Sequence, residues 1–355
     1  MILVDEAGEP ETLLGWVRKR PGMYVGGVHD GSGVLHVALE LVANAVDQAL
    51  AGRLSRLDVG VEGDETLVVS DDGPGIAADG AKDRPSLRDI LERRFELPTV
   101  DGHRPHVHLG FGGIGLAVAN AVAERLEIVT VHAGRQATAC YCRGVPLTAM
   151  RVEATDRSSG TCIRIRADPQ IFSSVCVPRE DLQHRLTDLS FLLPQLRISW
   201  MGEREHHGRG LPELARLHAP ATIGGVAHHR AVVGGLEEPI DVEVALVWGE
   251  GSTREATVQS FVNLGRAAEG VHREGVLDGL RSFFPRRGAA ARRVGLSAAV
   301  VVVLADVQWG SPIRDKLVTP AVRPAVQAVT MTALRAWAER YPEAAARIRA
   351  RGLEA

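Results

Sequence analysis

The chain has 355 residues, of which 45% are hydrophobic and 24% charged, and its formal net charge is −3 at pH 7. This length is enough for two domains of ordinary size, and the composition is normal for a folded globular protein. The near-neutral balance argues against a dedicated nucleic-acid binder, although a local basic surface stays compatible with it.

Targeting and membrane signals are weak in this sequence. Residues 1–12 are acidic and lack an apolar core, so they do not predict a signal peptide. The most apolar run, residues 294–307, is shorter than the roughly 20 residues of a membrane-spanning helix and predicts a buried strand. Four cysteines are too few for a disulfide framework in a chain of this length. We therefore expect a cytoplasmic protein without a membrane partner.

The first strong element is the segment GVLHVALELVANAVDQALAG, residues 33–52, which predicts a helix capped at Gly52. Its polar residues recur at steps of four, four and three and so share one face: His36, Glu40, Asn44 and Asp47. Such a stripe is ordinarily a solvated surface. Here it is narrow on a strongly apolar helix, which favours a buried helix whose polar stripe lines a cavity. A Glu in a cavity can activate water, and an Asn oxygen can ligate Mg²⁺.

Next along the chain, residues 57–70 predict a β-hairpin, because LDVGVE and ETLVVS flank the turn residues Gly63 and Asp64. The second strand runs directly into the sequence DDGPGI, residues 71–76. A carboxylate at a strand end, followed by glycines, places an acceptor beside backbone that a ligand can approach closely. By itself, this motif more often marks an ordinary Asp-Gly turn.

A second glycine-rich segment, HLGFGGIGLAVANAVAERL, precedes a predicted apolar helix over residues 116–124. Backbone N–H groups at a helix N-terminus form a site suited to phosphates. No Gly-Lys-Ser/Thr follows, so this is not a Walker loop; no strand precedes it, and its glycine spacing differs from a dinucleotide fingerprint. A lone glycine cluster is weak evidence. The acidic helix, the Asp-Gly loop and this cluster in this order strongly indicate a nucleotide site.

Later elements divide the chain in two. Further strands are predicted at residues 126–131, 137–142 and 161–166. The polar segment MGEREHHGRGL, residues 201–211, is the best candidate boundary. We expect a larger α/β domain over residues 1–205 and a second domain over residues 206–355.

The second part also mixes strands and helices. Strands are predicted at residues 242–248, 257–263 and 295–305. One or two alanine-rich helices follow over residues 319–351, broken or bent near Pro342.

Together these motifs resemble the ATPase region of bacterial DNA gyrase B and topoisomerase IV, within the GHKL superfamily. The similarity rests on these segments in the first part: RKRPGMYVG (18–26), the Glu40 helix ending in ALAG (49–52), DDGPGI (71–76), GFGGIG (110–115) and Gly160-Thr161. VEVALVW (242–248) and RDKLV (314–318) resemble the transducer domain of the same family. The similarity covers nearly the whole chain, and RKRPGMY is specific to this branch. It implies an α/β (α+β) two-layer sandwich, a Bergerat ATP-binding fold followed by a transducer domain similar to domain 2 of ribosomal protein S5.

The resemblance implies a role for each residue of the acidic helix and the Asp-Gly loop. Glu40 would be the general base that activates the attacking water, with His36 orienting it. Asn44 would hold the Mg²⁺ that bridges the phosphates, and Asp47 would belong to the nucleotide site. Asp71 would accept a hydrogen bond from the adenine amino group, supported by Thr161. Gly75 and Ile76 would flank the base.

The resemblance also assigns the phosphate end of the site. The lid backbone would contact the phosphates through Gly110, Gly113, Ile114 and Gly115. Arg314 falls where the family has a transducer lysine that reaches the γ-phosphate. Because Arg keeps the charge and binds phosphate in a two-pronged fashion, we expect the role to survive.

Several positions depart from the family pattern. Pro74 replaces a charged residue, Gln48 an acidic one, and Thr138 falls where the family has an arginine. In the family these charges meet at the pocket mouth, so we expect an altered mouth with an intact ATP site. The segment between Gly102 and Gly110 is short, and no tyrosine precedes Tyr24, which puts arm-swapped dimerisation in doubt.

Two functions stay open from the sequence. The first is the ATP-driven clamp of a gyrase B-like type II DNA topoisomerase, a nucleotide-dependent homodimer with DNA and an A-subunit or TOPRIM-containing partner. The second is a stand-alone gyrase-like ATPase, acting as a switch or as an ATP-dependent enzyme without DNA cleavage. The absence of a TOPRIM segment fits either an excised ATPase fragment or a free-standing relative. In both cases ATP and Mg²⁺ are the expected cofactors.

Overall fold

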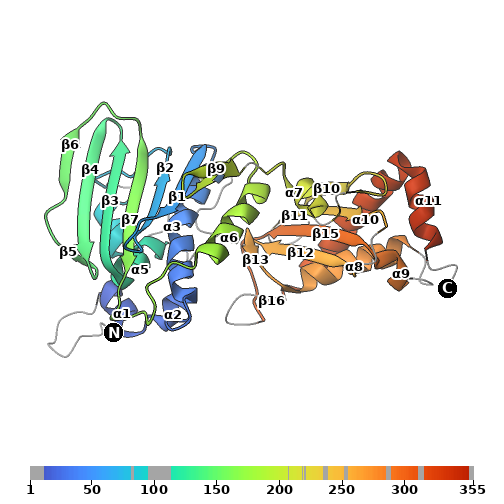
Figure 1. Ribbon diagram of the computed structural model, residues 1–355, viewed down its shortest axis with the longest axis horizontal. Coiled ribbons are helices and arrows are strands. Elements are labelled where there is room, and N and C mark those ends of the chain that lie inside the picture. Colours follow the sequence, from blue (N-terminus) through green and yellow to red (C-terminus); the bar gives the residue numbers. More distant parts are fainter. Residues whose placement is uncertain are drawn as a thin grey trace. The chain divides into compact units, whose positions relative to one another are not determined.

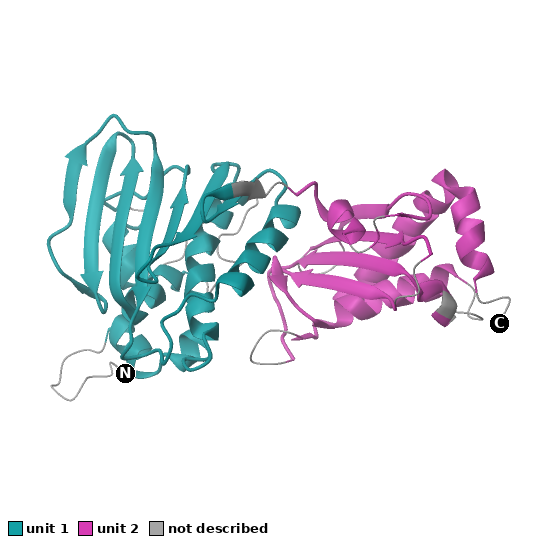
Figure 2. Cartoon of the chain, viewed as in Figure 1, with its two compact units in different colours: residues 1–207 teal, residues 208–355 magenta. Residues whose placement is uncertain are grey.

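The computed structural model describes most of the chain, in two compact units. The described residues are 12–80, 84–94, 113–206, 208–217, 219, 221–234, 239–251, 255–284, 289–310 and 316–351. Unit 1 comprises residues Met1–His207, and unit 2 comprises residues Gly208–Ala355 (Figure 2). The division falls inside the polar segment 201–211, whose first part forms a short strand.

Unit 1 is built on one nine-stranded sheet. Its strands are β1 (Arg56–Val61), β2 (Leu67–Asp71), β3 (Ala123–His132), β4 (Arg135–Cys142), β5 (Val145–Pro146), β6 (Arg151–Ala154), β7 (Gly160–Ala167), β8 (Arg197–Trp200) and β9 (Glu203–His206). Their order is β5-β4-β3-β7-β2-β1-β8-β9, with β6 paired to β4. All pairs are antiparallel except β1 with β8. The hairpin predicted at residues 57–70 is therefore β1–β2.

Helices cover one face of this sheet (Figure 1). They are α1 (Leu13–Lys19), α2 (Gly22–Val25), α3 (Ser32–Leu50), α4 (Leu87–Glu92), α5 (Gly115–Val122) and α6 (Arg179–Leu192). Helix α5 is shorter than the helix predicted at residues 116–124, because strand β3 begins directly at Ala123. The chain thus passes from helix to strand without a loop.

Helix α3 is the core helix of unit 1. Its length and hydropathy would suffice to cross a membrane, but most of it is buried inside the unit. Residues such as Leu41, Val42 and Val46 pack in the core, and such burial accounts for its apolar character. The sequence had singled out residues 294–307 as the most apolar run, and that run contains a buried strand, as predicted.

An ion-pair cluster fastens α1 to the end of the sheet. Asp168, which is fully buried, accepts hydrogen bonds from Arg18 Nη2 at 2.7 Å and Arg143 Nε at 3.1 Å. Arg18 also donates to the carbonyl of Ala121 in α5 at 2.7 Å. Burial by itself raises the pKa of Asp168, but hydrogen bonds from Gln170 and the two arginines outweigh it and lower the pKa. The first arginine of the RKRPGMY motif therefore helps to position α5.

Unit 2 has a five-stranded sheet in the order β10-β11-β15-β12-β13 and a separate ribbon, β14-β16. The strands are β10 (Ala227–Val233), β11 (Ile240–Trp248), β12 (Thr257–Val262), β13 (Gly265–Arg266), β14 (Glu269–Gly270), β15 (Leu296–Val303) and β16 (Lys316–Leu317). The helices are α7 (Leu211–Arg216), α8 (Val271–Phe283), α9 (Ala289–Arg293), α10 (Val322–Arg340) and α11 (Pro342–Ala350).

The core of unit 2 lies between its sheet and helices α8 and α10. Trp248 is fully buried there, with its ring 5.9 Å from that of Phe284 and 5.1 Å from that of Trp337, between centroids. The predicted helix over residues 319–351 is broken between Tyr341 and Pro342, as expected, because proline cannot continue a preceding helix.

Candidate nucleotide site

A cleft opens in unit 1 between helix α3 and strands β2 and β7. The empty space within it is about 690 Å³, which includes open solvent at its mouth. Its polar lining residues are Asn44, Asp47, Gln48, Asp71 and Thr161. Its remaining lining residues are Leu41, Val69, Pro74, Gly75, Ile76, Ile90, Leu116 and Ile163. The cleft is therefore mostly apolar with a few polar groups, as expected for a site that encloses an aromatic base.

Glu40 lies one helical turn from the cleft residue Asn44, and only 3% of its surface is exposed. His36 Nε2 donates a hydrogen bond to Glu40 Oε1 over 3.2 Å, so the imidazole orients the carboxylate. The other carboxylate oxygen faces the start of α5, where a Cβ on Gly115 would lie 2.0 Å from Glu40 Oε2. A larger residue at position 115 would displace this carboxylate, and the positive end of the α5 dipole faces it.

Asn44 and Asp47 line the cleft from the same face of α3. The Asn44 amide nitrogen donates to the Glu40 carbonyl over 3.1 Å, which leaves the amide oxygen for a ligand. An amide oxygen in a cleft suits a hard cation such as Mg²⁺. Among the described residues no group of three His, Cys, Asp or Glu side chains is placed to hold a metal alone. A cation here would need ligands from the nucleotide and water.

Two adjacent aspartates at the end of β2 have opposite environments. Burial raises the pKa of Asp71 to about 6, and the Asp72 charge adds to the rise, while hydrogen bonds from the backbone of Gly73 and Thr161 oppose it. The pKa of Asp72 is lowered: its partial burial acts in the other direction, but hydrogen bonds from Ser55 and Arg56 outweigh it. Asp71 is thus the carboxylate available to a ligand, and Asp72 fastens the start of β1.

The loop after Asp71 lies along the end of β3. Gly75 has a φ of +72°, and a Cβ there would lie 1.9 Å from the carbonyl oxygen of Val131, so only glycine fits. The Ile76 N–H donates to Thr130 Oγ1 over 2.7 Å. Thr130 is fully buried, and its hydroxyl lies 3.2 Å from that of Thr161. The Thr130 hydroxyl thus connects Ile76 and Thr161, the two residues that the sequence predicts near the adenine base.

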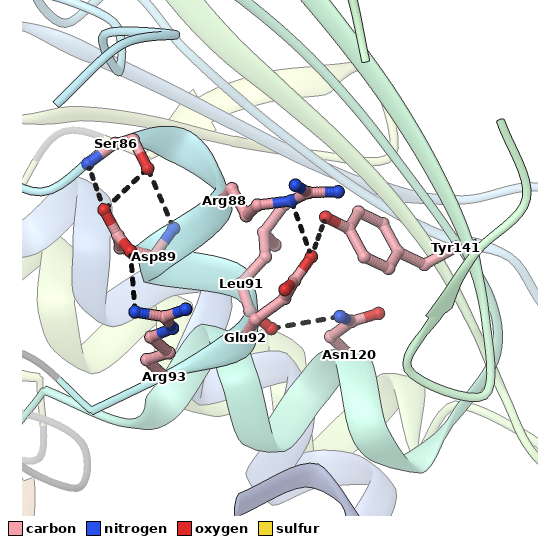
Figure 3. Close-up of polar contacts among 8 residues, drawn as sticks. All are labelled: Ser86, Arg88, Asp89, Leu91, Glu92, Arg93, Asn120 and Tyr141. Carbon is pink, nitrogen blue, oxygen red and sulfur yellow. Dashed lines mark hydrogen bonds and ion pairs between the residues drawn. The ribbon is translucent and has the colours of Figure 1, made fainter. Parts of the chain in front are cut away.

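Helix α4 contributes Ile90 to the lining of the cleft. Several polar contacts hold this helix in place (Figure 3). A capping box between Ser86 and Asp89 begins the helix. The buried Asn120 of α5 donates to the Leu91 carbonyl over 3.0 Å, and the Tyr141 hydroxyl of β4 donates to Glu92 over 3.0 Å. Burial and the Glu92 contact raise the pKa of Tyr141 to about 12, so the hydroxyl keeps its proton.

The structure gathers most of the residues singled out in the sequence around this cleft. Asn44, Asp47, Asp71, Gly75, Ile76 and Thr161 line it. His36 and Glu40 precede Asn44 and Asp47 on α3. Gly115 begins α5 beside Glu40, and Gly113 and Ile114 come directly before it. Gly110 and Arg314 lie outside the described residues. Of the altered mouth positions, Pro74 and Gln48 line the cleft, and Thr138 lies in β4.

Three residues near the cleft were missed from the sequence: Thr130, His132 and Asn120. The strand LEIVTVH held a signal for the first two, since alternation places Thr130 and His132 on the face of the buried Leu126 and Ile128. A polar side chain on a core face needs a polar partner. For Asn120, which looks like one more residue of an apolar helix, the partner is a carbonyl far away in sequence, and no local pattern reveals it.

Comparison with known proteins bears on the identity of this site. Residues 29–171 match the family described as histidine kinase-, DNA gyrase B-, and HSP90-like ATPase. The DNA gyrase B protein of Caulobacter vibrioides is 27% identical over 364 residues, covering 93% of this chain and 45% of the relative. The DNA gyrase B protein of Mycolicibacterium smegmatis is 28% identical over 379 residues, covering 92% and 56%. The chain thus spans about half the length of the curated relatives that it matches.

Solved structures share the fold. The 43K ATPase domain of Thermus thermophilus gyrase B, crystallised in complex with an aminocoumarin, aligns with a TM-score of 0.79 and 23% identity, covering 96% of this chain and 94% of that one. The ATP-binding domain of Francisella tularensis topoisomerase IV, in complex with a small-molecule inhibitor, aligns with a TM-score of 0.70 and 21% identity, covering 95% of each chain. The mixed α/β Bergerat-type fold predicted from the sequence is confirmed.

Proposed function

We propose that this chain, whose residues 29–171 belong to the histidine kinase-, DNA gyrase B- and HSP90-like ATPase family, binds ATP in the cleft of unit 1 and hydrolyses it to ADP and phosphate. One observation carries the proposal. His36 holds the buried carboxylate of Glu40 against the start of α5, one helical turn from the cleft. The lining of the cleft includes Asp71, whose pKa is raised to about 6.

The positions of the side chains support the following division of roles. Asp71, with Thr161 beside it, accepts a hydrogen bond from the adenine amino group. Gly75 and Ile76 pack against the adenine ring. Asn44 and Asp47 face the phosphate side, where Asn44 would supply an oxygen to Mg²⁺, and the bound ion would neutralise phosphate charge. The backbone at Gly113, Ile114 and Gly115 presents N–H groups to phosphate oxygens. The same role for Gly110, and that of Arg314 at the γ-phosphate, stay predictions.

Hydrolysis needs a base placed near an attacking water. The oxygen of the attacking water forms a bond to the γ-phosphorus while Glu40 accepts a proton from that water. The bond between the γ-phosphorus and the β–γ bridging oxygen breaks. His36 keeps one carboxylate oxygen engaged, and the other, which faces the start of α5, takes the proton. The buried position of Glu40 excludes other water from this oxygen.

The binding step is tested by calorimetry with ATP. Asp71→Asn exchanges an acceptor for an amide that can present a donor to the adenine amino group, which should cost about 1–3 kcal/mol. Wild-type protein should bind, and the variant should bind roughly 5- to 150-fold more weakly. Unchanged affinity in Asp71→Asn would remove the base-binding role from this cleft.

For the biological use of the ATPase, we propose the clamp of a gyrase B-like topoisomerase, which would act on DNA with an A subunit or TOPRIM-containing partner. The RKRPGMY motif and the names of the relatives support it. A non-hydrolysable ATP analogue should then shift the protein from monomer to dimer in light scattering, whereas ADP should not. A ligand moves an equilibrium only by its different affinity for the two states. A monomer under both conditions, with ordinary hydrolysis, would favour the stand-alone ATPase.

A further inference from the structure

The cleft wall formed by Pro74, Gly75 and Ile76 is a loop, so contacts with neighbouring elements determine its position. Strand β3 supplies three of them in succession. Thr130 accepts the Ile76 N–H, and the Val131 carbonyl packs against Gly75. His132 Nδ1 lies 2.8 Å from the Pro74 carbonyl oxygen. The contact made by the His132 imidazole has no role in the ATP hydrolysis proposed above.

The partners of His132 fix its protonation. A carbonyl oxygen only accepts, so Nδ1 must carry the hydrogen that is donated to Pro74. On the other side, Arg84 Nη1 lies 2.9 Å from His132 Nε2. A guanidinium only donates, so Nε2 must be the bare nitrogen. One neutral tautomer satisfies both contacts, and it is the tautomer that holds Pro74.

We propose that His132 is a positioning residue for the base end of the nucleotide site, and that Arg84 selects the tautomer in which His132 does this. The inference rests on the proposed binding of ATP in the cleft. Pro74 lines that cleft three residues after Asp71, so a displaced Pro74 carbonyl loosens the wall that packs against the base. The general base Glu40 lies on α3 and faces α5. A looser wall beside adenine therefore leaves Glu40 in place. The effect should therefore appear in affinity and KM, and kcat should stay unchanged.

Two conservative replacements separate the donor to Pro74 from the bulk of the ring. In His132→Asn the amide nitrogen takes the place of Nδ1 and can still donate to Pro74. In His132→Gln the amide group extends to the place of Nε2, so it can meet Arg84 but does not hold Pro74. Calorimetry should show ATP binding that is roughly 3- to 10-fold weaker in His132→Gln and His132→Ala, the worth of one such hydrogen bond. His132→Asn should stay within about twofold of wild type, and kcat should stay within about twofold in all three.

Arg84 gives an independent arm of the test. Arg84→Ala frees the imidazole to adopt the other tautomer, in which Nδ1 cannot donate, and should weaken ATP binding by roughly 2- to 3-fold. Because Arg84 acts through His132, the double variant Arg84→Ala/His132→Gln should be no weaker than His132→Gln alone. Additive losses would contradict the proposed order of contacts.

A matched histidine elsewhere serves as the control. His228 of β10, in unit 2, makes one side-chain contact with Glu243 at 2.9 Å, and His228→Gln should leave ATP affinity unchanged. If wild-type protein fails to bind ATP, the proposed function fails. If wild type binds and Asp71→Asn weakens binding but His132→Gln does not, only the role of His132 is overturned. Equal losses in His132→Asn and His132→Gln would overturn it as well, since the ring would then matter only for its shape.

Discussion

The two units differ in the carboxylates that they bury. In unit 1 four described carboxylates are buried: Glu40 and Asp47 lie on the cleft helix α3, whereas Asp168 is paired with Arg18 and Arg143 and Asp188 lies in α6. In unit 2 no described carboxylate is buried. Buried polar side chains there include two that bond to backbone: Asn263 exchanges two hydrogen bonds with Leu304, and Ser260 donates to the Ala267 carbonyl.

This difference helps to distinguish side chains that stabilise the fold from side chains that bind a ligand or take part in a reaction. A buried amide or hydroxyl that bonds to backbone repays its loss of hydration and adds to the uniqueness of the fold. A buried carboxylate is costly to keep ionised, so it persists where arginines compensate its charge, as at Asp168, or where a ligand or reaction needs it. Substitutions in the two units should therefore affect different measurements.

The largest effect should come from Glu40. Glu40→Ala removes the proton acceptor, so turnover should fall roughly 10²–10⁴-fold, the usual worth of a positioned general base. ATP should still bind, because the base and phosphate contacts of the cleft are kept. Steady-state phosphate release and calorimetry on the same preparation measure the two quantities.

This prediction has a clear way to be wrong. Ordinary hydrolysis by Glu40→Ala would mean that α3 does not carry the base. A loss of binding equal to the loss of turnover would mean that Glu40 supports the fold in the way Asn263 does, and the contrast between the units would disappear.

Trp248 should show the opposite behaviour. Trp248→Ala deletes a fully buried ring that contacts Phe284 and Trp337 and whose Nε1 donates to the Arg292 carbonyl, so unfolding free energy should fall by about 3–5 kcal/mol. Denaturant unfolding of unit 2 measures this loss. While the protein stays folded, ATP affinity should match wild type, because the cleft residues all belong to unit 1.

Trp248→Phe is the matched control, since it keeps an aromatic ring and loses the indole donor. It should cost clearly less than Trp248→Ala. A large loss of ATP affinity in the folded Trp248→Phe protein would show that the core of unit 2 acts on the cleft.

The sequence predicted those parts of the molecule in which local patterns decide the structure. Apolar periodicity placed α3, the β1–β2 hairpin and the buried strand β15, and Pro342 placed the break between α10 and α11. The polar stripe of α3 and the DDGPGI loop also led to the cleft. What escaped was contact between distant segments. Neither the bond from His132 to Pro74 nor that from Asn120 to Leu91 leaves a local trace, because each depends on how β3 and α5 pack.

The smallest expected effect concerns pH and the adjacent aspartates. Because the pKa of Asp71 is raised to about 6, the carboxylate takes up a proton as pH falls through that value. In the unliganded protein, stability from this group is fully present below its ordinary pKa of 3.8 and is lost as pH rises through about 6. ATP binding has the opposite sign, since the ionised carboxylate is the better acceptor. Affinity should fall by up to about tenfold between pH 7 and pH 5, as the ionised fraction falls.

Because the phosphates of ATP also titrate, the useful quantity is the ratio of wild-type affinity to that of Asp71→Asn at each pH. The variant retains the titration of ATP and lacks that of Asp71, so the ratio isolates the carboxylate. It should decline below about pH 6 and level off above pH 7. Asp72 should not contribute, since its lowered pKa keeps it ionised throughout. A ratio that is flat from pH 5 to pH 8 would mean that Asp71 does not bind the adenine amino group through an ionised carboxylate. The proposed role of Glu40 in hydrolysis would remain.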